Sequence, residues 1–194
     1  MVEIKKKTDC VSWDDIRKLI FFAHESNRKN GVDIRNAHLS AGELKTCVGE
    51  DGICLVALDG TKLVGTCSVA FENLDCWYAK GMCAYFTLDA VSPDYKGKGI
   101  FSQLEKKRLE TVLQLCVNTA FMYVAEKNVV RRRIAKKHGF TPVEIRYNPF
   151  NSHNFIVYCK YFNDKRLTFR LYARCRFIAQ WLKLKTKQWV KKIL

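Results

Sequence analysis

Apolar positions in the first part of the chain predict two helices followed by a β-hairpin. Apolar residues recur at helical spacing over residues 12–29, and Ser12 with the acids that follow it is typical of a helix N-terminus. A shorter helix is expected over residues 40–48. Two apolar runs, residues 53–58 and 62–71, flank an Asp-Gly pair, which is a strong signal for a tight hairpin turn.

The middle of the chain alternates strand-like and helical segments. Residues 72–81 are expected to form a loop, after which a strand (82–91), a helix (100–117) and a second strand (120–124) follow one another. A strand, a helix and a strand in this order form a parallel crossover unit. One helix and two strands complete the prediction: residues 128–138, 145–147 and 155–159. The predicted fold class is α/β, with a mixed central sheet and helices on both of its faces.

Residues 165–194 are predicted to form a basic, amphipathic helix. Six apolar residues fall near one stripe of it: Leu167, Leu171, Cys175, Ile178, Leu182 and Trp189. We therefore divide the chain into a domain over residues 1–162 and a basic helical extension over residues 163–194. Three partners for the stripe remain open: an anionic membrane surface, the domain itself or a second subunit, and nucleic acid. No DNA- or RNA-binding motif supports the last.

The charge of the chain is positive and uneven. The net charge is +15, and from residue 155 onward 11 Lys and Arg residues stand against one acid, so +10 of the total lies in this segment. Such an excess points to anionic partners. The nine cysteines form no CxxC pair, which disfavours a zinc site and indicates buried thiols in a reducing compartment. Because we find no signal peptide and no membrane-spanning run, we expect a cytoplasmic protein or one bound peripherally at a membrane surface.

A glycine-containing loop between the strand over residues 82–91 and the helix over residues 100–117 carries the candidate chemistry. It reads Val91-Ser92-Pro93-Asp94-Tyr95-Lys96-Gly97-Lys98-Gly99-Ile100-Phe101. Glycine lets the backbone approach a ligand closely, and the first turn of a helix presents N–H groups without internal partners. With Lys96 and Lys98 adding positive charge, the loop is predicted to bind a pyrophosphate. It matches neither the P-loop nor the dinucleotide pattern, since Ser102 replaces the third glycine of the latter.

This loop resembles the acetyl-CoA signature of the GNAT superfamily of N-acetyltransferases, usually Gln/Arg-x-x-Gly-x-Gly/Ala after a strand. A second family-like element follows at the expected distance: Asn128, an amphipathic helix, and then His138-Gly139-Phe140. The resemblance covers roughly residues 10–160. Two positions depart from the family pattern: Lys96 replaces the usual Arg or Gln, and Phe101 stands where the family prefers Gly or Ala.

The resemblance implies a GNAT fold with acetyl-CoA as co-substrate and no metal. The cofactor would lie in the gap where the strand before the loop leaves the strand over residues 120–124, with its pyrophosphate on the loop. The implied cofactor-binding residues are Val91, Lys96, Gly97, Lys98, Gly99, Ile100, Phe101 and Asn128.

The implied chemistry is direct attack of a neutral amine on the thioester, which requires a group that takes the amine proton. Because side chains alternate along a strand, Tyr85, Thr87 and Asp89 are expected on one face. Asp89 is the first candidate base and Tyr85 the second; an ion-paired carboxylate and a packed aromatic ring are the structural alternatives. The tyrosine that often protonates the leaving thiolate in this family is absent, because its position falls on Ala135.

The leading prediction is an N-acetyltransferase that acts on a small-molecule or lipid-linked amine. Phe101 and Ala135 motivate one alternative, a CoA-binding module without catalysis. A basic protein that binds nucleic acid or a membrane on a GNAT-like scaffold is the other. Whether the protein forms a homodimer stays open. The glycine-containing loop carries no information about the identity of the acceptor.

Overall fold

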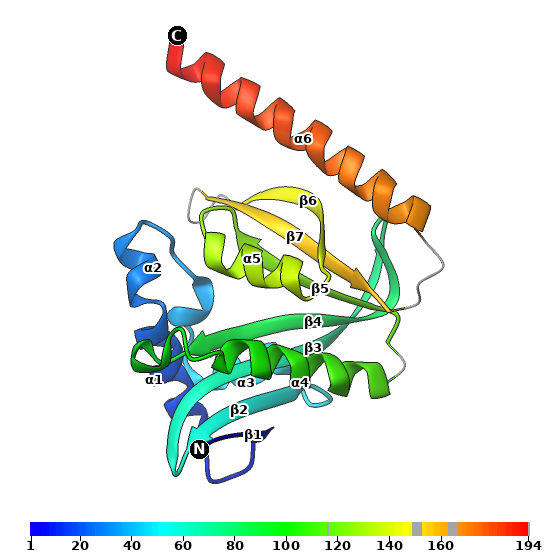
Figure 1. The fold of residues 1–194 in the computed structure, drawn as a ribbon. Coiled ribbons are helices and arrows are strands. Elements are labelled where there is room, and N and C mark those ends of the chain that lie inside the picture. The colour runs from blue at the N-terminus through cyan, green and yellow to red at the C-terminus, as the bar shows by residue number, and fades with distance from the viewer. Residues whose placement is uncertain (116, 149–152, 163–166, 194) are drawn as a thin grey trace.

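The computed structural model describes residues 1–115, 117–148, 153–162 and 167–193, and its strands form one seven-stranded sheet (Figure 1). The strands are β1 (Val2–Lys6), β2 (Ile53–Asp59), β3 (Lys62–Cys76), β4 (Ala79–Val91), β5 (Thr119–Ala125), β6 (Thr141–Asn148) and β7 (His153–Tyr161). Their order is β1-β2-β3-β4-β5-β7-β6. Neighbouring strands are antiparallel except β4 and β5, which are parallel, so the predicted mixed sheet is confirmed.

Helices cover both faces of this sheet. They are α1 (Trp13–Ala23), α2 (Glu25–Lys29), α3 (Ala41–Val48), α4 (Ile100–Gln114), α5 (Val129–Lys137) and α6 (Leu167–Ile193), with single 3-10 turns at η1 (Arg35–Ala37) and η2 (Pro93–Tyr95). β2 shows the division, because its alternate residues enter different cores. Leu55 and Ala57 pack with Ile100 of α4, whereas Val56 packs with Ile20 of α1 and Leu44 of α3.

The two N-terminal helices begin where the sequence predicts. Ser12 and Ser40 are their N-caps, and each forms a reciprocal capping box with an acid three residues later. The single helix predicted over residues 12–29 is, however, divided into α1 and α2. The break falls at His24, whose ψ of 4° leaves the helical region.

The loop predicted over residues 72–81 is wrong. β3 continues to Cys76 and β4 begins at Ala79, so these residues form the end of a long hairpin. Asn73 and Asp75 are typical of loops, but both are exposed on alternate positions of β3 while their neighbours are half-buried. The sequence reasoning also missed β1, a short edge strand rich in lysine.

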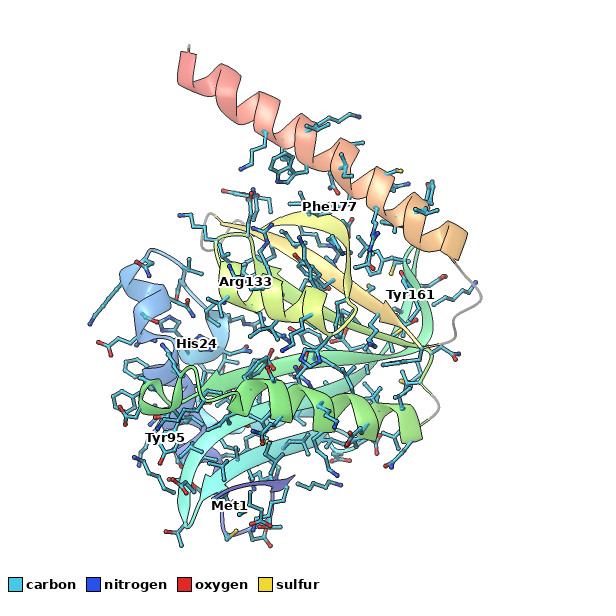
Figure 2. All side chains as sticks on the ribbon, viewed as in Figure 1. Met1, His24, Tyr95, Arg133, Tyr161 and Phe177 are labelled. Atoms are coloured by element: carbon cyan, nitrogen blue, oxygen red, sulfur yellow. The ribbon has the colours of Figure 1, made fainter. Side chains whose placement is uncertain are left out.

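The basic extension forms α6, which lies across the outer strand β6 on the side of the molecule away from the N-terminus (Figure 1). Ala173 is fully buried against the body of the protein, and Phe177 packs against the main core from the side of α6 that faces the sheet (Figure 2). Gln180 binds the free edge of β6: its side chain accepts from the Ile145 N–H (3.1 Å) and donates to the Ile145 carbonyl (2.9 Å). α6 therefore shields a strand edge that would otherwise be open to pairing.

Candidate functional site

The loop between β4 and α4 has the backbone of an anion cradle. Gly97 and Gly99 have φ angles of 79° and 76°, in the left-handed region. A Cβ at either position would meet no atom within 4 Å, so conformation rather than crowding requires glycine there. Gly99 is the N-cap of α4 and no side chain caps this helix. The N–H groups of the first turn therefore remain available to an anion.

Side chains hold this loop in place from two sides. The Tyr95 hydroxyl donates to the Asp59 carboxylate at the end of β2 (2.8 Å), and the Lys98 ammonium lies 4.5 Å from the Tyr95 ring centre. On the other side, the Lys96 ammonium donates to the Ser26 hydroxyl of α2 (3.2 Å). Both predicted lysines thus border the cradle while their charges remain at the surface.

The first turns of helix α4, immediately after the loop, pack closely against the sheet. A Cβ on Gly65 of β3 would lie 3.0 Å from the Leu104 side chain and 3.2 Å from that of Ile100, so the absence of a side chain permits this approach. Ile100 is buried in the core, and Phe101 packs partly against it. The guanidinium of Arg131 lies over the Phe101 ring, 4.8 Å from its centre. The bulk of Phe101 is thus packed between core and arginine.

The predicted strand gap opens directly upstream of the loop. β4 and β5 pair at only two positions, Ala84 with Ala120 and Tyr85 with Phe121, and further pairing between them is absent from the described register. Leu88 in β4 has a φ of 54°, and the β3–β4 register shifts beside it, which identifies a β-bulge. A residue other than glycine in this conformation costs on the order of 1–3 kcal/mol, and such strain concentrates at functional sites.

The bulge changes the face on which Asp89 lies, so the predicted shared face of Tyr85, Thr87 and Asp89 is wrong. Thr87 accepts a hydrogen bond from Asn36 in η1 (3.2 Å), on the side of α1. Asp89 points to the opposite side, where its Oδ1 pairs with Arg108 of α4 at 2.6 Å. The extra residue at Leu88 shifts the alternation by one position.

Asp89 belongs to a buried network of two acids and two arginines. Its Oδ2 pairs with Arg131 of α5 at 2.8 Å, and both arginines also pair with Glu105. Glu105 and Arg108 have no exposed surface. Both carboxylate oxygens of Asp89 are thus engaged by arginines, an arrangement that favours the structural alternative over the predicted role as a base.

The pKa values within the network follow from its pairing. Burial raises the pKa of Glu105, but the charges of Arg108 and Arg131 outweigh burial and hold it below its ordinary value. Burial lowers the pKa of Arg108, and Asp89 and Glu105 more than offset this, so its pKa is raised. Glu105 and Arg108 therefore both stay charged at neutral pH. The Arg108 guanidinium also donates to the carbonyls of Ser68 (3.1 Å) and Thr87 (3.4 Å), on the two strands beside the bulge.

Tyr85 lies on the sheet face opposite to the network, which we call the acceptor face. Its ring stacks on Phe121 (5.1 Å between centres) and meets Tyr123 edge-on (5.6 Å). Burial raises the pKa of Tyr85 to about 12. Its hydroxyl is therefore neutral at physiological pH, which makes it a proton donor rather than a base.

The sequence reasoning missed an acid on the acceptor face. Glu72 of β3 pairs in register with Cys83, two residues from Tyr85 along β4, so Glu72 and Tyr85 lie on the same side of the sheet. Burial raises the pKa of Glu72 above its ordinary value. Its position in a segment predicted to be a loop concealed it.

The remaining predicted positions have structural partners. The Asn128 side chain accepts from the Arg131 N–H (3.0 Å) and is the N-cap of α5. Ala135 is fully buried and offers no proton to a thiolate. Among the described residues, no group of His, Cys, Asp and Glu side chains could hold a metal ion.

The strand gap and the loop are features of transferase folds that bind an acyl-CoA. Comparison with known proteins agrees with this class of protein. The profile of the Acetyltransferase (GNAT) family matches residues 13–140, so the chain belongs to this family. No curated protein sequence matches the chain significantly.

Solved structures share the fold at low sequence identity. A probable acetyltransferase from Staphylococcus epidermidis is 15% identical with a TM-score of 0.66, over 84% of this chain and 100% of that one. The ribosomal-protein-S18-alanine N-acetyltransferase from Escherichia coli is 15% identical with a TM-score of 0.63, over 86% and 99%. A GNAT acetyltransferase from Elizabethkingia anophelis with acetyl-CoA bound is 15% identical with a TM-score of 0.59, over 83% and 98%. These likenesses confirm the predicted fold.

Proposed function

We propose that the protein transfers an acetyl group from acetyl-CoA directly to the amine of an acceptor. The observation that carries this proposal is the placement of the uncapped α4 N-terminus at the mouth of the β4–β5 gap. Bound acetyl-CoA supplies the activated acetyl group. The N–H groups of residues 97–101, with Lys96 and Lys98, would hold its pyrophosphate, and the β4 backbone up to Val91 would align its acyl arm.

Tyr85 is the residue of the acceptor face best suited to the leaving group. In the reaction the amine nitrogen forms a bond to the carbonyl carbon, the carbon–sulfur bond breaks, the amine loses a proton and the thiolate gains one. The neutral Tyr85 hydroxyl can donate its proton as the thiolate leaves, and the proton that the amine loses restores it; Ala135 has no proton to give. Tyr85 thus replaces, in this proposal, the tyrosine that the family carries on the helix after β5.

Glu72 supplies the negative charge that an amine acceptor requires. Amines are cations in water, and a half-buried carboxylate on the acceptor face would attract them and take up the released proton through water. Tyr123, which is exposed, and the Arg146 guanidinium, which lies 5.9 Å from its ring centre, border the same face, and buried Tyr78 lies beneath Arg146. This border suits an acceptor with a flat or apolar body beside its amine.

Calorimetry with CoA tests the cofactor site. Gly99→Glu is expected to abolish binding, since it places bulk and negative charge where the pyrophosphate would lie and forces a left-handed conformation on glutamate. Gly31→Glu is the matched control, because Gly31 also has a positive φ (67°) and open space around its Cα. Loss of CoA affinity in both variants, or in neither, would remove the loop as the binding site.

Thiol release from acetyl-CoA across a panel of primary amines tests catalysis. Turnover that falls in Tyr85→Phe, with unchanged CoA affinity, would support the donor role. Glu72→Gln is expected to raise KM for the amine more than it lowers kcat. CoA binding without turnover on any amine would instead favour a CoA-binding module, the alternative that buried Ala135 and the arginine-packed Phe101 support.

A further inference from the structure

Helix α6 has two apolar faces, and one of them packs on the sheet in the part of the chain that the structure describes. Ala173, Phe177 and Leu184 face the sheet, and Gln180 between them binds the β6 backbone. These positions share one side of the helix at about 100° per residue. They are not the stripe that the sequence analysis identified, which lies on a different side of the helix.

The stripe lies on the opposite side of α6 and is exposed. Leu171 is 55% exposed, Ile178 is 55% exposed and Leu182 is 53% exposed, with Cys175 exposed between them. Trp181 at its margin is 37% exposed. The side chains of Leu167 and Trp189, which the sequence places in the same stripe, lie outside the described residues. The alternative in which the stripe packs on the domain is wrong for the four described members.

Positive charge flanks this stripe on both sides. Helical spacing places Arg174 and Lys185 along one margin and Arg176 and Lys183 along the other. From Leu167 to Ile193 the sequence contains eight Lys and Arg residues and no acid. The charged groups of two of these cations have partners on the protein: the Lys185 ammonium pairs with Glu126 (3.1 Å), and the Arg176 guanidinium lies over the Trp77 ring (4.8 Å).

The combination of an apolar ridge and flanking cations restricts the partner. A second copy of this face would bring the flanking cations of the two helices together, so charge argues against a symmetric dimer there. Nucleic acid would satisfy the cations but would leave the leucine and isoleucine side chains in water. An anionic lipid surface satisfies both, because headgroup phosphates meet the cations and the acyl boundary accepts the apolar ridge.

We propose that the exposed face of α6 binds an anionic lipid membrane, with the helix axis parallel to its surface. None of the described helices is long and apolar enough to cross a membrane, so α6 would lie in the interface. Since the opposite face of α6 is fixed on β6, binding would place the whole protein on the aqueous side in one orientation. This inference does not depend on acetyl transfer.

Sedimentation of the full chain with vesicles of phosphatidylglycerol and phosphatidylcholine tests the proposal. A triple variant, Leu171→Glu, Ile178→Glu and Leu182→Glu, is expected to lower the partition coefficient at least about tenfold, because even one leucine-sized side chain transferred from water is worth about that factor. The matched control changes three other exposed apolar residues, Leu113→Glu, Leu115→Glu and Val130→Glu. It alters the net charge equally and should bind like the wild type.

Further measurements on the wild type and the variants test the role of the cations and the class of partner. Arg174→Gln should weaken binding about fivefold, in line with about 1 kcal/mol per cation near an anionic surface, and vesicles of phosphatidylcholine alone should bind weakly. Equal vesicle binding of wild type and stripe variant would overturn the proposal, as would absence of binding to anionic vesicles. A lipid-free dimer that the stripe variant loses would assign the face to a second copy, and RNA binding that it loses would assign it to nucleic acid.

Discussion

Replacing Arg108 with methionine should destabilise the protein strongly, because it removes one charge from a balanced buried network. Arg108 and Arg131 face Asp89 and Glu105, so the four charges cancel. Methionine fills a similar volume without charge. It would leave one net negative charge among groups with little or no exposed surface, and it would leave the Ser68 carbonyl without its guanidinium donor.

The expected loss is about 3–5 kcal/mol, the range found when one partner of a buried ion pair is removed. A domain of this size has about 5–15 kcal/mol of stability in total. At about 2–4 °C per kcal/mol, the melting temperature should fall by about 6–20 °C. Removing Glu105 as well, in the double variant Arg108→Met with Glu105→Gln, restores charge balance and should cost less than the sum of the two single changes.

Urea unfolding followed by circular dichroism measures these differences. Arg133→Met is the matched control, since Arg133 lies on the exposed side of α5 (Figure 2), and it should change stability by no more than about 0.5 kcal/mol. A loss below about 1 kcal/mol for Arg108→Met, or strict additivity in the double variant, would refute the view that the network acts as one balanced unit.

Three further outcomes are expected. Gly65→Val should cost about 1–3 kcal/mol in thermal unfolding, because its side chain would enter the tight contact between β3 and α4. Since the folded pKa of Glu105 is held below its unfolded value of about 4.3, its contribution is present above that pH and is lost as pH falls through the folded pKa. Melting between pH 6 and pH 3 should therefore show a steeper acid loss in the wild type than in Glu105→Gln. Replacing Tyr85 with phenylalanine should leave the melting temperature within about 2 °C of the wild type while turnover falls, as an activity assay beside a melting curve would show.

The sequence was sufficient to predict the structural features that local patterns determine. The two serine caps, the Asp59-Gly60 hairpin and the helix after Gly99 depend on neighbours in the chain, and the structure has them at or near the predicted positions. The strand through residues 72–76 was missed because its pairing with β4 stabilises it, and that pairing is a tertiary contact.

The charged network could have been suspected from the sequence. Leu104, Arg108 and Val112 follow one another at intervals of four, so an arginine stands within the apolar stripe of α4. A charge at such a position requires a buried partner. Its partners could not be identified, because Asp89 reaches α4 only through the bulge at Leu88, and no local pattern in β4 marks a leucine with a positive φ.

The bulge and the network explain each other, and this gives Arg108 a positioning role beside its effect on stability. The strained backbone at Leu88 needs support, and Arg108 donates to Thr87 before the bulge and pairs with Asp89 after it. The same backbone leaves β5 and continues to Val91 and the loop. If Arg108 only filled the core, Arg108→Met would bind CoA normally at any temperature where it remains folded. If it holds the bulge, CoA affinity should fall at least about tenfold, that is by 1.4 kcal/mol, at low temperature where circular dichroism shows a folded protein.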